Sequence, residues 1–527
     1  VIARSTLPNS RSYDPDAISE LDFISSFSDR PADQRKRHRP LQVIVNQYTF
    51  EWSFSDYANL IIFHYVIHND GPPLRNVWLG MYDELASGNM RLQNTYPPSG
   101  WFNKKLIGYV DSLSMVTERY CQAAVQSACR FDLVPEIVGV KLLGVKSRGV
   151  VDTAGKQVTF AAWSYAPGSA ARDEDSLKYQ LMSTGIKQSL VPLPDSLAPV
   201  TGDPVTLLAV GPFNTVNPGD SISVDFAYLG GLTMEELAKR AVIAQRAYDL
   251  DYIVPVPPPS PRMKIVAREN ALDYYWEDDP ESFFDPTSPI HQDFEGYRLY
   301  LGSSRDSLDM VAQFDLATAP HDTTGFNTGL DGPKLATPVT IDGVTYQYKF
   351  TVDHLRDGFK YYAAVTSYDI GDANIESLES GFAQNEVVVL PGPAPGGERA
   401  GLGVTVFPNP YRVEASWDRG QQAKDHYLWF ANLPAQCSIR IYTLAGDLIY
   451  KTDFDGATYT GLNARGINRG GADIKTVLPG SMWGWDLITR EGQAAATGLY
   501  MWAVEDKHSG KRETGKFLLV KSDREDF

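Results

Sequence analysis

The chain has 527 residues, of which 43% are hydrophobic and 21% charged, and its formal net charge is −17. This length predicts two to four domains, and this composition predicts a globular protein. The negative charge argues against nucleic acid and anionic membranes as partners. We find no stretch of about 18 uncharged apolar residues and therefore expect no transmembrane segment. The sequence starts at Val1, and we expect any signal peptide to have been removed.

Residues 1–40 are rich in Asp, Arg, Ser and Pro and have little apolar patterning, so we expect an extended N-terminal arm. An arm without its own core is ordered only against another surface, either its own large domain or a neighbouring subunit. Contact with a neighbour would allow self-association into a homo-oligomer or polymer. The apolar side chains expected to make this contact are Ile18, Leu21, Phe23, Ile24 and Phe27.

Residues 41–254 alternate between apolar and polar side chains in short runs, which predicts a large β-sandwich domain. We expect strands at 60–67, 77–82, 136–145, 157–164 and 221–228. The segment GPFNTVNPGDS at 211–221 is expected to be a turn-rich link. One helix is expected near 233–250, because Thr233 and Glu236 form a capping box before apolar residues at helical spacing.

The next predicted domain is 255–391, and a Pro-rich linker at 253–261 leads into it. Its Trp276, the pair Gly296-Tyr297 with Tyr300, and the late strand region 355–369 resemble a fibronectin type III module. The segment 302–349 is longer than that pattern expects and is interpreted as an insertion. A second linker is expected at 392–403.

The last predicted domain, 404–522, consists of short alternating runs separated by Gly turns. It resembles the Ig-like fold of the flagellar hook cap and type IX secretion sorting domains. The matching residues are Phe407-Pro408-Asn409-Pro410, the run 441–446, Trp485-Asp486, Gly492 and the run 496–500. We expect Trp485 to be buried, and Gly446 and Gly498 to lie in turns. The resemblance implies export and surface display rather than catalysis.

Three cysteines are too few for a disulfide scaffold. Cys121 and Cys129 are eight residues apart and either form one local disulfide, in an oxidising compartment, or remain buried thiols. Cys437 is expected in a strand and in the core.

The remaining motifs give only weak indications of metal, phosphate or sugar binding. His64 and His68 lie on one strand, about 13 Å apart, which does not favour a shared metal. The near phosphate loop at 510–517 is interpreted as a hairpin turn. Acidic clusters at 173–175, 278–279 and 453–455 are expected in turns, either solvated or holding structural calcium. Trp101-Phe102 and Trp417 either pack or stack on sugars.

The sequence therefore predicts an all-β protein of tandem β-sandwiches with one short helix. It resembles secreted bacterial multidomain β-sandwich proteins. The favoured hypothesis is a non-enzymatic, secreted structural or surface protein without cofactors, possessing at most structural calcium. Two alternatives remain open: an adhesive protein that binds surface glycans, and a hydrolase with two close carboxylates in a deep cleft of the 41–254 domain.

Overall fold

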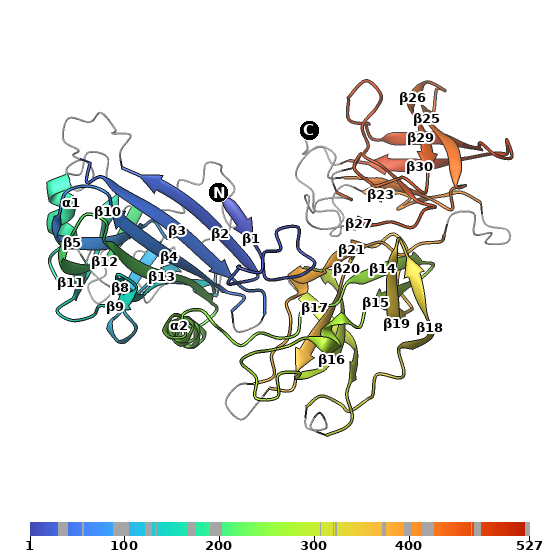
Figure 1. Ribbon diagram of the computed structural model, residues 1–527. Coiled ribbons are helices and arrows are strands. Elements are labelled where there is room, and N and C mark those ends of the chain that lie inside the picture. The colour runs from blue at the N-terminus through green and yellow to red at the C-terminus, as the bar shows by residue number, and fades with distance from the viewer. Residues whose placement is uncertain are drawn as a thin grey trace. The chain divides into compact units, whose positions relative to one another are not determined.

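The computed structural model divides into two compact units, Val1–Pro255 and Val256–Phe527 (Figure 1). Both units consist mainly of antiparallel sheets, so the all-β class with tandem sandwiches is confirmed. The structure describes residues 1–29, 40–54, 57–87, 105–121, 129–132, 134–165, 175–189, 203–305, 307–319, 321, 324–371, 376–394, 403–412, 426–464, 466–467 and 476–521.

The first unit is a sandwich of a nine-stranded and a four-stranded sheet. In spatial order, the large sheet contains β1 (Ile2–Arg4), β2 (Leu21–Ser28), β3 (Val43–Glu51), β4 (Leu60–Asn69), β13 (Ser221–Gly231), β8 (Ile137–Ser147), β7 (Met115–Tyr120) and β6 (Lys105–Val110), with β9 (Val150–Val151) paired to β8. The small sheet contains β11 (Lys187–Ser189), β10 (Gln157–Tyr165), β12 (Asp203–Val216) and β5 (Leu74–Asp83).

Alternation along the strands places apolar residues of both sheets in a shared core. Val224 and Phe226 of β13 pack in one cluster with Phe160 of β10 and Leu208 of β12. Burial of this apolar surface is the main stabilising contribution to the unit.

The interpretation of 211–221 as a link was wrong, because Gly211–Val216 belong to β12. Strand β12 pairs with β5 on both sides of an irregularity between Val210 and Phe213. The bulge absorbs Gly211 and Pro212, the two residues that looked like turn signals, and Phe213 returns to the core.

The N-terminal segment forms β1 and β2 at the outer edge of the large sheet (Figure 1). Strand β2 pairs with β3 over its whole length, from Leu21 opposite Glu51 to Ser28 opposite Ile44. The segment therefore lies on its own domain and is not a separate extended arm. The backbone groups of β2 that face β3 are satisfied by this pairing, which explains how a segment with few apolar residues is ordered.

The expected helix is present as α2 (Met234–Asp249), with the Thr233 side chain accepting a hydrogen bond from the Glu236 N–H at 3.1 Å. Its buried side chains cover the face of the large sheet opposite the sandwich core. Gly144 of β8 lies against the Tyr248 ring, and a Cβ there would approach the ring to 2.5 Å. A second helix, α1 (Asp175–Met182), was not expected.

The second unit starts with a sandwich of two sheets around Trp276, which is fully buried. One sheet contains β14 (Met263–Arg268), β15 (Ala271–Trp276), β19 (Val344–Val352) and β18 (Lys334–Ile341). The other contains β17 (Ser307–Asp315), β16 (Phe294–Ser304), β20 (Tyr361–Asp369), β21 (Val387–Val389) and β27 (Thr476–Val477). The segment 302–349 thus supplies regular strands rather than an insertion, and 355–369 supplies one strand, β20, rather than a pair.

A second sandwich follows. One sheet contains β22 (Thr405–Phe407), β24 (Leu428–Ala431) and β28 (Trp483–Trp485). The other contains β23 (Tyr411–Arg412), β30 (Arg512–Val520), β29 (Gly498–Asp506), β25 (Gln436–Thr443) and β26 (Leu448–Asp455). Trp485 is fully buried and Gly446 lies in a turn with a φ of 94°, both as predicted. Gly498 was wrongly predicted, since it starts β29 opposite Leu519. The turn before it contains Gly492, with a φ of 76°.

Candidate functional site

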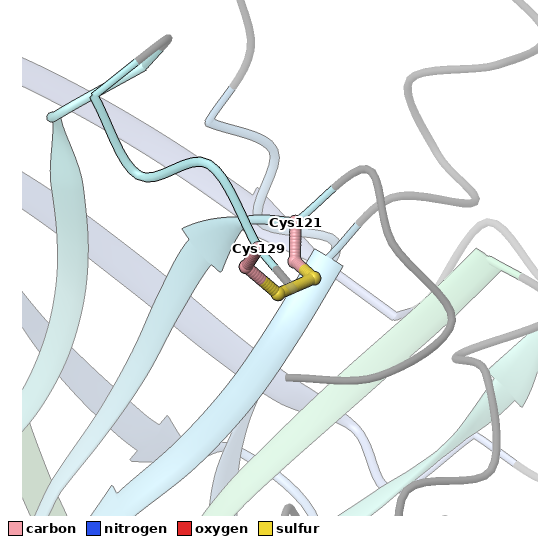
Figure 2. Close-up of a disulfide and its surroundings, with 2 residues drawn as sticks. All are labelled: Cys121 and Cys129. Carbon is pink, nitrogen blue, oxygen red and sulfur yellow. A yellow bond between two sulfur atoms is a disulfide. The ribbon is translucent and has the colours of Figure 1, made fainter. Parts of the chain in front are cut away.

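Cys121 and Cys129 form a disulfide directly after β7 (Figure 2). Cys121 follows Tyr120, the last residue of the strand, and the bond ties this strand end to the chain that leads to β8. Cys437 is a buried free thiol on β25, and burial raises its pKa to about 12, which makes it unreactive. Of the two alternatives for the first pair, the structure contains the disulfide.

The predicted contact residues do not form one patch. Leu21, Phe23 and Phe27 share one face of β2, because they lie an even number of residues apart, whereas Ile24 points to the opposite face. Ile18 precedes the strand. The fractional exposures of Ile18, Phe23 and Phe27 are 44%, 38% and 51%. The strand thus displays two aromatic rings on one side.

The face of β2 that carries Phe23 continues into the sandwich core. Phe23 pairs with Thr49, Thr49 with Phe63, and Phe63 with Phe226 of β13. Phe226 is 1% and Thr49 6% exposed, whereas Phe23 at the end of this row is 38% exposed. The large sheet therefore extends beyond the cover of the small sheet, and its inner, apolar face is open at β2.

The backbone of β2 is also open at its edge. Strand β1 pairs only with Asp22, Phe23 and Ile24. Among the described residues, no strand pairs with Ser25–Ser28 on that side. Unpaired N–H and C=O groups at a sheet edge can accept an added strand.

Two carboxyl groups with raised pKa values lie between the sheets of the first unit. Asp83 of β5 accepts a hydrogen bond from the Tyr228 hydroxyl, and burial raises the pKa of Asp83 to about 6. Glu118 of β7 accepts one from the Ser87 N–H at 2.7 Å, and burial raises the pKa of Glu118 to about 7. Among the described residues, Asp83 Oδ2 and Glu118 Oε1 have no hydrogen-bond partner.

These carboxyl groups do not match the hydrolase alternative. Asp83 is 5% and Glu118 0% exposed, so both lie inside the sandwich rather than in an open cleft. Each is held by a different partner, Tyr228 or Ser87. Their effect on the molecule is a pH-dependent stability.

His64 takes part in a local polar cluster rather than a metal pair with His68. His64 Nδ1 lies 2.6 Å from Asp225 Oδ1, and the Tyr252 hydroxyl donates to the same oxygen. Tyr252 follows α2, so the cluster fastens the end of the helix to β4 and β13. Within the described part of the chain, no three His, Cys, Asp or Glu side chains are grouped to hold a metal ion.

The acidic clusters that we considered for calcium are dispersed. Asp278 and Asp279 lie at the start of a short 3-10 helix. Asp453 and Asp455 are on strand β26 and not in a turn, because β26 continues pairing with β25 to its last residue, Asp455. Of 173–175, only Asp175 is described, and it starts α1. Trp101-Phe102 and Trp417 lie outside the described residues.

Sequence reasoning did not find a group of three buried carboxylates in the second unit, because they come from separate segments. Asp285 lies in the loop before β16, Asp293 directly precedes β16, and Asp369 ends β20. Their exposures are 3%, 4% and 3%. Burial raises the pKa of Asp369 to about 7, and the negative charges of Asp293 and Asp285 add to the rise.

No known protein family matches the sequence, and no curated protein is significantly similar to it. Searches of solved structures find PorZ, a surface component of the type IX secretion system of Porphyromonas gingivalis, at 17% identity over 49% of this chain and 22% of PorZ (TM-score 0.16). Dimeric latent PorU of the same organism is 14% identical over 51% of this chain and 20% of PorU (TM-score 0.14). A polysaccharide lyase is 9% identical over 71% of this chain and 39% of the lyase (TM-score 0.19).

The chain spans less than a quarter of the length of PorZ and of PorU. In the described part, no helix is both long and apolar enough to cross a membrane.

Proposed function

We propose that the chain is an exported, non-enzymatic structural protein that acts as a subunit of an extracellular or cell-surface assembly. The observation that carries this proposal is the open apolar face and open edge of β2. Phe23 and Phe27 are exposed beside unpaired backbone groups of Ser25–Ser28. A neighbouring subunit that adds a strand here would cover both the rings and the edge.

The contact that follows from this geometry repeats readily. A strand of one subunit added to the β2 edge of the next is a heterologous contact, which joins two different surfaces. Such contacts form rings or open chains. Each subunit would use its β2 edge for one neighbour and a different surface for the other.

Export is supported by the disulfide between Cys121 and Cys129, because such bonds persist mainly in oxidising compartments. The resemblance of the last domain to type IX sorting domains supports a bacterial surface location. The lack of catalysis is supported by the roles found for His64, Asp83 and Glu118, which each fasten structural elements of the fold.

The test is the assembly state of the full chain, measured by light scattering and negative-stain microscopy. The double variant Phe23→Ser/Phe27→Ser should reduce oligomers or polymers to monomers, since it removes the apolar surface of the contact. A second variant, Ser26→Pro, should have the same effect by blocking the edge.

Phe326→Ser is the matched control, because Phe326 is 67% exposed on the other unit. It should leave assembly unchanged. A wild-type chain that stays monomeric at all concentrations, or assemblies that persist in both β2 variants, would refute the proposal.

A second candidate, glycan binding, has one favourable observation. Tyr82 of β5 and Trp163 of β10 lie on the outer face of the small sheet with ring centroids 5.8 Å apart, and Tyr82 is 50% exposed. Half-exposed aromatic rings can stack on sugars. A glycan array should then show binding that Tyr82→Ala abolishes and Tyr13→Ala, on an exposed residue elsewhere, preserves. Array binding without assembly would favour this function over the structural one.

A further inference from the structure

The two most exposed Phe side chains among the described residues lie on loops of the first sandwich of the second unit. Phe284 is 58% exposed and belongs to the segment 277–293, between β15 and β16. Phe326 is 67% exposed and belongs to the segment 316–333, between β17 and β18. Rings on loops leave apolar surface in water, and such surface commonly marks a place where another molecule binds.

Hydrogen bonds join these two loops to the chain that follows β20. The Ile370 N–H donates to the Asp293 carbonyl at 3.0 Å, and the Thr324 hydroxyl donates to the Ile370 carbonyl at 3.2 Å. The three segments therefore form one continuous surface at the end of the sandwich where β20 ends. Loops gathered at one end of a rigid sandwich are a common place for recognition.

The loop tips that carry the two rings are held in place. The Asp285 N–H donates to the His291 carbonyl at 2.7 Å, and the His291 ring stacks on Phe284 with the centroids 4.8 Å apart. The Phe326 N–H donates to Asp315 Oδ2 at 2.7 Å. A partner therefore meets rings whose positions are already fixed, so less conformational entropy is lost on binding.

The same loops are strongly acidic. The segments 277–293, 316–333 and 370–378 contain six, two and two Asp or Glu residues, respectively, and no Lys or Arg. Asp279 and Asp331 are exposed and form no ion pair within the described part of the chain. Carboxylates around apolar rings attract a positively charged partner and repel a negatively charged one.

We propose that this end of the sandwich docks a basic segment of another protein. Phe284 and Phe326 would pack on the apolar parts of that segment, and the surrounding carboxylates would pair with its Lys or Arg side chains. Arg suits both parts of such a surface, because its guanidinium pairs with carboxylates and also stacks on aromatic rings. This contact lies on the second unit, whereas β2 belongs to the first.

The test is the binding of a short fluorescein-labelled peptide of alternating Arg and Leu to the full chain, measured by fluorescence anisotropy. The peptide should bind, and added salt should weaken binding, because screening reduces the attraction. The same peptide with Ser in place of Arg should bind about tenfold more weakly or less, since it lacks the charge.

The double variant Phe284→Ser/Phe326→Ser should weaken binding of the Arg peptide about tenfold or more, because it removes both ring anchors. Phe359→Ser is the matched control. Phe359 is 45% exposed and lies just before β20 begins, at the opposite end of the same sandwich.

Charge is tested in the same way. Asp279→Asn/Asp331→Asn should weaken binding of the Arg peptide severalfold, because two exposed carboxylates of the surface are lost. Asp309→Asn/Asp353→Asn removes the same charge away from the three loops and should bind like the wild type.

Hydrogen exchange of the wild-type chain gives a readout that does not depend on any variant. Peptides that cover 283–293 and 324–328 should exchange more slowly when the Arg peptide is bound. No binding of the Arg peptide, equal binding of the Ser peptide, or a double Phe variant that binds like the wild type would overturn the proposal.

Light scattering of the chain alone separates this contact from assembly. If the double Phe variant changed the assembly state, a second copy of the chain would occupy the surface, and the proposal of a different, basic protein would be wrong. Variants of β2 should leave peptide binding unchanged, so the two proposals fail separately.

Discussion

The fully buried side chain of Trp485 is both packed against other rings and held by one hydrogen bond. Its ring contacts Tyr450, Tyr500 and Phe517, with centroids 5.9–6.4 Å from its own. Its Nε1–H donates to the Ile488 carbonyl at 2.9 Å. The alternation around Trp485 was sufficient to predict its burial, because the apolar face of a short strand packs on the core and a large ring gains most from that burial.

Replacing Trp485 by Ala should therefore destabilise the last sandwich by about 3–5 kcal/mol, through lost burial and the cavity that remains. Trp485→Phe keeps part of the ring and loses the hydrogen bond, so its effect should be clearly smaller. Urea unfolding of both variants measures the difference. Equal stability of wild type and Trp485→Ala would contradict the burial.

The buried Glu118 predicts how the stability of the first unit depends on pH. Burial raises its folded-state pKa to about 7, well above the value in an unfolded chain. Between these values the folded state binds more protons, so the free energy of unfolding of the first unit should fall as pH rises from about 5 to 8. The contribution is on the order of 3 kcal/mol. Asp83, with a pKa raised to about 6, acts in the same direction at slightly lower pH.

Glu118→Gln should remove much of this slope and make the first unit more stable at pH 8, because no charge has to be buried. Hydrogen exchange of peptides from β7 and β8 at several pH values measures it. A wild-type stability that rises with pH over this window would show that the sign is wrong.

At the scale of elements, the sequence predicted the helices and strands for which several local patterns indicate the same structure. Helix α2 was found because the Thr233 cap and the helical spacing point to the same element. Strand β12 was missed at 211–216, because Gly211 and Pro212 look like a turn and are instead absorbed by a bulge. Whether the N-terminal segment lies on its own domain or on a neighbouring subunit was left open by the sequence, because the stabilisation of β2 comes from pairing with β3, which lies beyond any local pattern.

The three buried carboxylates of the second unit could not be predicted for a related reason. Asp285, Asp293 and Asp369 are ordinary loop and strand-end residues in sequence, and the last is 76 positions beyond Asp293. Only the pairing of β16 with β20 brings them together. A chain with 65 acidic residues contains many pairs that never meet.

The disulfide is an element-scale constraint on the connection between β7 and β8. A short loop closed by a disulfide gains about 2–3 kcal/mol, mainly because the unfolded chain is restricted. Cys121→Ala/Cys129→Ala should lower the stability of the first unit by about this amount. Reductant should destabilise the wild type and have no further effect on the double variant.

Thiol titration in denaturant without reductant provides the check. Of the three cysteines, Cys437 alone should react, since it is the one free thiol. Three reactive thiols per chain would show that the bond does not form in the isolated protein.

At the scale of the whole molecule, the second unit contains two sandwiches that share a sheet. Strand β27, which comes from the segment of the last sandwich, pairs in parallel with β21 of the preceding one, Val389 opposite Val477. The Leu390 N–H donates to the Val477 carbonyl at 3.0 Å, and the Ser481 hydroxyl to the Pro393 carbonyl at 2.6 Å. The segment 392–403 was expected to be a linker. Pro393, near its start, instead accepts a hydrogen bond from the last sandwich.

Because these bonds break only when the sandwiches separate, we expect the second unit to unfold in one calorimetric transition rather than two. Val477→Pro removes a backbone N–H and disturbs the two-residue strand β27, so it should split that transition. Val477→Ala keeps the backbone and should leave it single. Two separate transitions already present in the wild type would mean that the shared sheet does not couple the sandwiches. A single transition would show that the two sandwiches unfold as one cooperative unit.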